Sequence, residues 1–134
     1  GDAYTGAVRV ADNAQLYRLA AFAGKGVTLA AGSDAPYGGT DPWAAMRAAV
    51  SRRTRDGALI GPDEVLTPEA ALALYLADPE DLTRQRAVTV GAAADLCLLD
   101  RPWRVARERL LAEDVRVVMI GGSIVHERIN EAPV

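Results

Sequence analysis

The sequence has 134 residues, of which half are hydrophobic and a quarter are charged, a composition typical of a folded globular domain rather than a disordered chain. Fifteen basic and eighteen acidic side chains give a net charge of -3, so the chain lacks the basic character that attracts nucleic acid or an anionic membrane. Its apolar stretches are shorter than the roughly 18 to 20 residues of a membrane span, so we expect a soluble chain with no nucleic-acid or membrane partner.

The first part of the chain predicts a helix followed by one buried strand. Apolar residues recur at helical spacing from Asn13 to Gly26, and the glycine is placed to end the helix. The next apolar run, Val27 to Ala31, is typical of a parallel strand covered on both faces. Asp34 follows directly, and in parallel α/β folds functional groups gather beyond the C-terminal ends of the strands. Asp34 is therefore the first candidate for a functional site.

Two further helices have clear start signals. Asp41 and Pro42 supply an N-cap acid and a proline at the first helical position, and this helix is expected to end near Arg55. Thr67 and Pro68 repeat the pattern, with an acidic residue in the first turn. We expect a helix-strand-helix unit followed by this third helix.

Beyond the third helix the signals change from helix to strand. Residues 77–86 have no apolar periodicity and predict a loop. Gly121-Gly122 between two strand-like runs predicts a hairpin, because both glycines can adopt positive φ. The other expected elements are strands at Val88–Val90, Ala94–Leu99, Val115–Ile120 and Ser123–Arg128 and a short helix at Val105–Leu111. We therefore divide the chain into two parts, 1–86 and 87–134.

Several single residues have both a structural and a functional interpretation. Cys97 lies in an apolar run, so we predict that its thiol is buried and inert. A lone buried thiol fits a reducing, cytoplasmic compartment, and no leader peptide is present in the sequence shown. We predict that His126 is a surface residue in a strand, because no other metal-ligating residue lies at a spacing suitable for a metal site. Arg47, Arg52, Arg53 and Arg55 could hold a substrate carboxylate or a phosphate, but a solvated helix face is the favoured interpretation.

Two aromatic residues near Asp34 are the candidates for substrate contact. Tyr37 lies three positions after it in the same turn region. Trp43 is expected to be a packing residue that also lies close enough in sequence to form a pocket wall. Asp34 itself has a structural alternative, since an aspartate before a turn often only caps that turn.

Taken in order, the motifs of this chain resemble the C-terminal part of the amidohydrolase superfamily, and most closely amidohydrolase family 3, which includes the YtcJ-like proteins. The motifs that carry the resemblance are Gly32-Ser33-Asp34-Ala35-Pro36, Asp41-Pro42-Trp43, Arg52-Arg53-Thr54, Leu66-Thr67-Pro68-Glu69-Ala70-Ala71, Gly91-Ala92-Ala93-Ala94-Asp95-Leu96, Leu99-Asp100 and Gly121-Gly122. The resemblance implies an α/β fold in which a metal-dependent (β/α)8 TIM barrel is joined to a small composite β-sandwich. Residues 1–86 would then hold the last barrel strand and helices, and residues 87–134 the C-terminal strands of the sandwich.

The resemblance also implies a function. Asp34 matches the carboxylate that contacts a catalytic divalent metal, expected to be zinc, and acts as general base in hydrolysis of carbon-nitrogen bonds of amides or cyclic amides. A divalent metal lowers the pKa of bound water from about 15.7 to about 7, and a nearby carboxylate can take the remaining proton. The implied partner is a small amide-type substrate.

The family's other metal ligands have no match in this chain, since its His-x-His pair and further histidines would all precede residue 1. We therefore expect the chain alone to be inactive and to bind no metal. Its uncovered strand edges would be covered by a missing N-terminal barrel segment or by self-association. The alternative is a non-catalytic scaffold or assembly module with this architecture.

Overall fold

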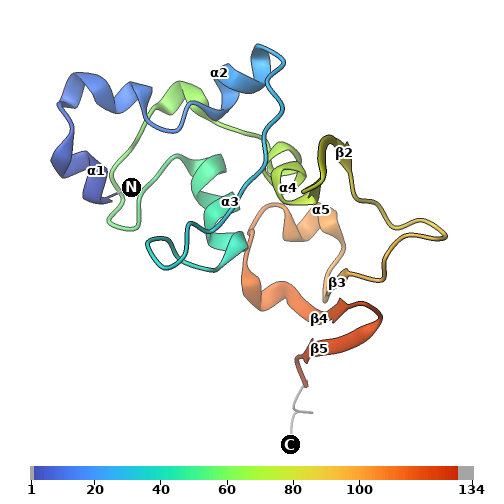
Figure 1. The fold of residues 1–134 in the computed structure, drawn as a ribbon. Helices are drawn as coiled ribbons and strands as arrows, with labels where there is room; N and C mark the ends of the chain where they lie inside the picture. The colour runs from blue at the N-terminus through green and yellow to red at the C-terminus, as the bar shows by residue number, and fades with distance from the viewer. Residues whose placement is uncertain (1, 130–134) are drawn as a thin grey trace, which may run out of the picture.

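The computed structural model describes residues 2–129. Helices make up the N-terminal and central regions, and a small antiparallel sheet lies at the C-terminal end, away from α1 (Figure 1). The helices are α1 Asp2–Ala7, η1 Val10–Gln15, α2 Leu19–Gly24, α3 Pro42–Ser51, η2 Pro62–Glu64, α4 Pro68–Leu76, α5 Trp103–Ala106 and η3 Ala112–Asp114. The strands are β1 Ala77–Asp78, β2 Asp81–Gln85, β3 Leu96–Leu99, β4 Val115–Ile120 and β5 Ser123–Glu127. Within residues 2–129, every helix is too short or too polar to cross a bilayer.

Both predicted N-caps are confirmed. The side chain of Asp41 accepts a hydrogen bond from the backbone N–H of Trp43 at 2.9 Å, with proline at the first position of α3. Thr67 does the same for α4, where its Oγ1 accepts from the backbone N–H of Ala70 at 3.1 Å. Each cap satisfies a donor that the first helical turn leaves without an intrahelical partner.

Helices α3 and α4 pack against the start of the C-terminal sheet to form the core. α3 contributes Trp43 and Met46 to this core, and Leu66 and Ala71 come from the region of α4. The other buried members are Leu110 and Val115. The core is therefore shared by residues on both sides of the division at residue 86.

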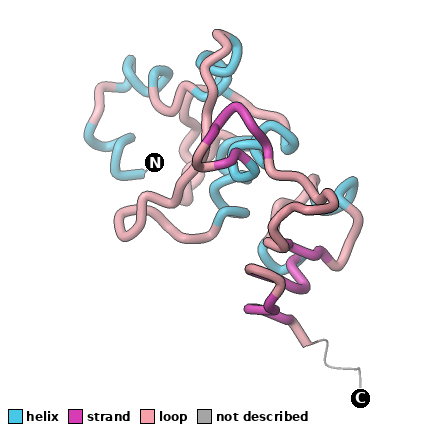
Figure 2. The backbone as a smooth tube through the Cα atoms, turned by 45° about the vertical axis from the view of Figure 1, so that its right-hand side comes forward, coloured by secondary structure: helices cyan, strands magenta, loops and turns pink. Residues whose placement is uncertain are grey.

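The C-terminal sheet has the strand order β3-β4-β5 with antiparallel pairing throughout. Its strands lie near the C-terminal end of the described chain (Figure 2). The predicted hairpin is confirmed, since Gly121 and Gly122 connect β4 to β5 with φ angles of 55° and 80°. Asp95 Oδ1 accepts a 2.7 Å hydrogen bond from the backbone N–H of Gly121 and so anchors this turn to the segment before β3.

The loop predicted at residues 77–86 is instead a short hairpin of β1 and β2. This hairpin is stabilised by hydrogen bonds and an ion pair between nearby polar side chains, and polar residues give no hydrophobic periodicity from which a strand could be predicted. Asp78 forms an ion pair with Arg84 and also accepts a hydrogen bond from the backbone N–H of Glu80 at 3.0 Å. Asp81 Oδ1 accepts from both the N–H and the hydroxyl of Thr83.

The helix predicted from Asn13 to Gly26 is broken into η1 and α2. The break lies at Tyr17, whose φ of 53° is left-handed and incompatible with a continuous right-handed helix. The second predicted helix ends at Ser51 rather than near Arg55, because Arg52 adopts a left-handed backbone with φ of 55°.

Three more expectations differ from the structure. Val27–Ala31 forms no strand, because within residues 2–129 no other strand runs beside it to pair with its backbone. Val88–Val90 likewise lies outside the strands. The helix expected at Val105–Leu111 is α5, which ends at Ala106, and Leu110 has a left-handed φ of 48°. The barrel and sandwich that the resemblance implies are therefore not visible as such in these residues.

Candidate functional site

Asp34 lies in a tight turn directly after the apolar segment Val27–Ala31. Its φ of 54° is left-handed, which is uncommon for a residue with a side chain and costs energy unless the surroundings hold it there. The carbonyl oxygen of Asp34 accepts two backbone hydrogen bonds, from the N–H groups of Tyr37 and Gly38, each at 2.9 Å. These bonds fix the backbone while the residue remains exposed to solvent.

The residues on either side of Asp34 complete the turn. Ser33 Oγ accepts a hydrogen bond from the backbone N–H of Ala35 at 3.3 Å. The peptide bond between Ala35 and Pro36 is cis. Ser33 and Ala35 are both small, so they leave the approach to the carboxylate open.

A wide, open hollow of about 1200 Å³ lies beside this turn. Gly32, Tyr37 and Thr40 line it on the side of the turn, and Arg47 and Tyr75 line it on the side of α3 and α4. Asp34 itself is not part of the lining. The turn therefore places Asp34 next to a space large enough for a small molecule, but not inside it.

Tyr75 is a possible functional residue that the sequence pattern predicted only as part of an apolar helix stripe. It is half-buried, and burial raises its pKa, with the charge of Asp41 adding to the increase. Tyr75 lines the hollow, and a phenol can both donate and accept a hydrogen bond. Nothing in the spacing of the apolar residues could have identified it.

The two aromatic candidates occupy different surroundings. Tyr37 is 91% exposed and lies in the Asp34 turn at the edge of the hollow. Trp43 is 8% exposed and belongs to the hydrophobic core, which confirms its packing role. Tyr37 therefore lies in the same turn as Asp34, and Trp43 packs in the core. Contact with a substrate stays a prediction for both residues.

Of the four arginines of the basic cluster, Arg52 departs from the solvated face that the sequence favoured, whereas Arg47, Arg53 and Arg55 are exposed as expected. Arg52 is only 5% exposed, and its guanidinium donates to the backbone carbonyls of Leu16, Ile60 and Gly61 at 2.9 to 3.1 Å. Burial lowers the pKa of Arg52, and the charge of Glu64 partly opposes that effect. A buried guanidinium needs several acceptors, which only the folding of distant segments around it can supply.

Two other members of the arginine cluster also bind backbone oxygens. Arg47 donates to the carbonyl of Leu110 at 2.7 Å and so links α3 to the C-terminal part of the core. Arg53 is exposed and donates to the carbonyl of Gly57 at 2.9 Å. Arg47 and Arg52 therefore help to hold distant segments of the fold together.

Cys97 and His126 are both exposed. The burial predicted for Cys97 is wrong, because it lies in β3 at the edge of the sheet. Partial desolvation nevertheless raises the pKa of its thiol, so it is not an activated nucleophile. The surface position predicted for His126 in a strand is confirmed, since it lies exposed in β5 opposite Val118.

The donor side chains of the described residues do not cluster as a metal site requires. Within residues 2–129, no group of three or more histidine, cysteine, aspartate and glutamate side chains lies close enough together to hold a metal ion. A catalytic zinc site needs about three protein ligands, and Asp34 supplies one carboxylate at most. These residues alone therefore do not fit a complete metal centre.

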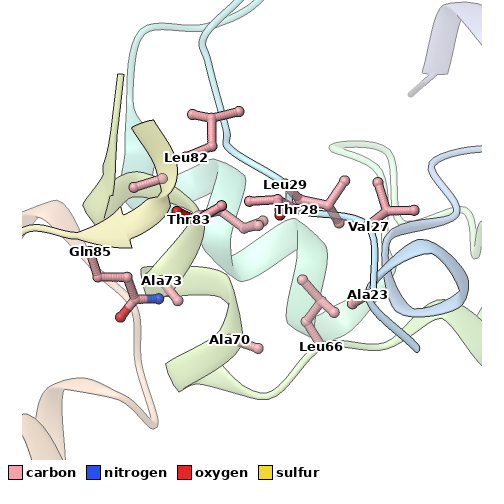
Figure 3. Close-up of a pocket in the computed structure, with 12 residues that line it drawn as sticks. Ala23, Val27, Thr28, Leu29, Leu66, Ala70, Ala73, Leu82, Thr83 and Gln85 are labelled. Atoms are coloured by element: carbon pink, nitrogen blue, oxygen red, sulfur yellow. The ribbon is translucent and has the colours of Figure 1, made fainter. Parts of the chain in front are cut away.

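A second hollow, of about 410 Å³, lies against the first part of the Val27–Ala31 segment. Residues of α2, of the segment itself, of α4 and of β2 surround it (Figure 3). Val27, Leu29 and Leu82 are among its mostly apolar side chains, and Val27 and Leu82 are 48% and 41% exposed. The segment thus presents an uncovered apolar surface.

Comparison with known proteins gives two matches and one negative result. Residues 4–126 match the family described as the amidohydrolase family. The chain is 30% identical over 122 residues to an N-substituted formamide deformylase from Arthrobacter pascens, an alignment that covers 87% of this chain and 22% of that relative. The chain thus spans about a fifth of the length of this relative. No solved structure matches the chain.

Proposed function

Because this chain belongs to the amidohydrolase family, we propose that it is the C-terminal part of a metal-dependent hydrolase that cleaves carbon-nitrogen bonds other than peptide bonds. The family match over residues 4–126 is the observation that carries this proposal. The similarity to a deformylase of N-substituted formamides favours small amide-type substrates, a class that includes formamides and cyclic amides.

Asp34 is the general base of this proposed reaction. Its carboxylate takes a proton from the attacking water and passes it to the leaving nitrogen, a role for which residue type and access to solvent are both suitable. The left-handed backbone at Asp34 is compatible with the assignment, since such conformations occur at active sites as well as in ordinary turns, where aspartate tolerates them. Tyr37, in the same turn, is the substrate-contact candidate closest to this carboxylate.

The rest of the active site comes from outside these residues. A divalent metal, which we propose to be zinc, needs further ligands that residues 2–129 do not supply. In this proposal residues 1–86 form the last strand and helices of a TIM barrel, and residues 87–134 form strands of a composite β-sandwich. Asp34 then contributes one contact to a metal held mainly by other barrel strands.

The large exposed surface of the chain supports the need for a covering segment. The structure exposes 9530 Å², whereas a compact monomer of 14.2 kDa exposes about 6,800 Å². The excess of about 2,700 Å² is larger than the roughly 800 Å² that each partner buries in a standard-size protein interface. A partner segment that covers this area would bring the exposed fraction to that of an ordinary folded protein.

The Val27–Ala31 segment is where we place the contact with that partner. Thr28, Leu29 and Ala30 form no backbone hydrogen bonds with any other residue in the range 2–129, so their N–H and C=O groups are available to neighbouring strands. The apolar hollow of about 410 Å³ beside the segment leaves its side chains uncovered as well. A missing N-terminal barrel segment fits here, and in its absence self-association covers the same surface.

The test of the catalytic role is Asp34→Asn in the longer hydrolase polypeptide that contains this segment. The substitution keeps the shape of the side chain but removes its ability to accept a proton, so kcat should fall by about 10²- to 10⁴-fold. Asp63→Asn is the matched control, because Asp63 is also exposed but lies in η2. Unchanged activity in the Asp34 variant would exclude the general-base role.

The isolated 134-residue chain provides a second test. It should show no amidase activity and no tight zinc binding by calorimetry, because most of the ligands are absent. If it folds as a stable monomer at high concentration and the longer polypeptide has no hydrolase activity, the alternative of a non-catalytic scaffold or assembly module is supported instead.

A further inference from the structure

We propose that Gly38 is a positioning residue for Asp34: the absence of its side chain lets the turn close, and the closed turn fixes the direction of the Asp34 carboxylate. This inference rests on the proposed function, in which that carboxylate is the general base. It assigns a role to a residue that neither the motif at residues 32–36 nor the family match identifies.

The geometry of the turn excludes a side chain at position 38. A Cβ added to Gly38 would overlap the carbonyl oxygen of Ser33 and lie 3.2 Å from the carbonyl carbon to which that oxygen is bonded. It would also lie 3.7 Å from the Cβ of Asp34. Because the obstacle is backbone rather than the end of a flexible side chain, the turn must open to make room.

Opening the turn would act directly on Asp34. The backbone N–H of Gly38 donates one of the two 2.9 Å hydrogen bonds that the carbonyl oxygen of Asp34 accepts. Those bonds oppose the natural tendency of Asp34 to leave its left-handed conformation at φ 54°. A residue with Cβ at position 38 therefore weakens the bonds and releases the backbone that carries the carboxylate.

The neighbouring Gly39 provides a matched control. A Cβ added to Gly39 meets no atom within 4 Å, and neither Gly38 nor Gly39 has a positive φ angle. The two glycine-to-alanine substitutions thus change the unfolded chain equally and differ in the crowding of the Asp34 turn.

The first experiment measures amide hydrogen exchange by NMR on the 134-residue chain itself. In Gly38→Ala, the amides of residues 37 and 38 should exchange at least about fivefold faster, as expected for the loss of ordinary hydrogen bonds. In Gly39→Ala their exchange should be unchanged. Equal exchange in both variants overturns the proposal, and so does a Gly38→Ala chain that fails to fold, since Gly38 would then serve the fold as a whole.

The second experiment is a double-mutant cycle on the activity of the longer hydrolase polypeptide. Gly38→Ala should lower kcat by about tenfold to a hundredfold with little change in KM, as expected when a reacting group is displaced by about 1 Å. In the Asp34→Asn background it should have no further effect, because Gly38 acts only through Asp34.

The outcomes separate this inference from the proposed function. If Asp34→Asn is inactive while Gly38→Ala has normal kcat, the positioning role is wrong and the general base stands. If Gly38→Ala lowers the residual activity of Asp34→Asn by the same factor as in the wild type, its effect is general and the positioning role is again overturned. Full activity of Asp34→Asn refutes the proposed function itself.

Discussion

Replacing Arg52 with alanine is expected to destabilise the fold strongly, because one buried guanidinium connects three segments of the chain. Its Nε donates to the carbonyls of Ile60 and Gly61 at 3.0 and 3.1 Å, and its Nη2 donates to the carbonyl of Leu16 at 2.9 Å. A hydrogen bond to a charged group contributes about 1.5–3 kcal/mol, and two donor groups are lost. We therefore expect the free energy of unfolding to fall by about 3–6 kcal/mol, a large part of the roughly 5–15 kcal/mol of a typical domain.

The measurement is urea denaturation of the 134-residue chain, followed by tryptophan fluorescence because Trp43 is buried in the core. Arg53→Ala is the control: it removes the same charge and side chain from the next position, where the arginine is exposed and binds one carbonyl, that of Gly57. This control should change the free energy of unfolding by less than about 1 kcal/mol. Similar losses for both variants, or a loss below about 1 kcal/mol for Arg52→Ala, would refute the reasoning.

Three further predictions concern local features. Thr67→Ala should lower the free energy of unfolding by about 1 kcal/mol in the same denaturation assay, because it removes the N-cap of α4, and Thr67→Ser should restore most of the loss. Gly122→Ala should lower it by about 1–2 kcal/mol, because φ of 80° disfavours any side chain; an unchanged melting temperature would contradict the observed turn. The hydrogen bond from Arg84 holds the pKa of Asp78 below its ordinary value of 3.8, so the stabilisation of the β1–β2 hairpin is complete above about pH 4 and is lost as the pH falls below that. An NMR titration of Asp78 should show this depressed pKa, and Arg84→Ala should return it towards 3.8.

Elements that depend on local signals were predicted well. The N-caps Asp41 and Thr67 mark the starts of α3 and α4, because a cap needs only a short polar side chain and the next few backbone groups. The Gly121-Gly122 turn was predicted for the same kind of reason, since the required φ angles restrict the residue type. Failures came where local side-chain bonds had no periodic pattern, as in the β1–β2 hairpin.

For the candidate site, the sequence singled out Asp34 and its turn as candidates and gave no information on the surroundings. Tyr75 lies beside the hollow only because α4 packs next to α3, and an apolar helix pattern gives no sign of this. The placement of Trp43 in the core and of Arg52 under three backbone carbonyls also depends on distant segments. A side chain at position 38 is excluded by the path of the backbone around Ser33, and no residue pattern specifies that path.

The sequence alone predicted the family, from motifs spread along the chain, and it predicted the capped helices and the C-terminal hairpin, because a cap and a tight turn each depend on residues close together in the chain. The role of Asp34 stays a prediction. Only the tertiary structure decided that Arg52 is buried, that Tyr17 breaks a helix and that Val27–Ala31 has no partner strand among residues 2–129. The physical reason is that a buried charge needs acceptors and a strand needs neighbours, and both are supplied by segments far away in sequence. For Val27–Ala31, residues 2–129 contain no such neighbour, so a strand-like sequence forms no strand.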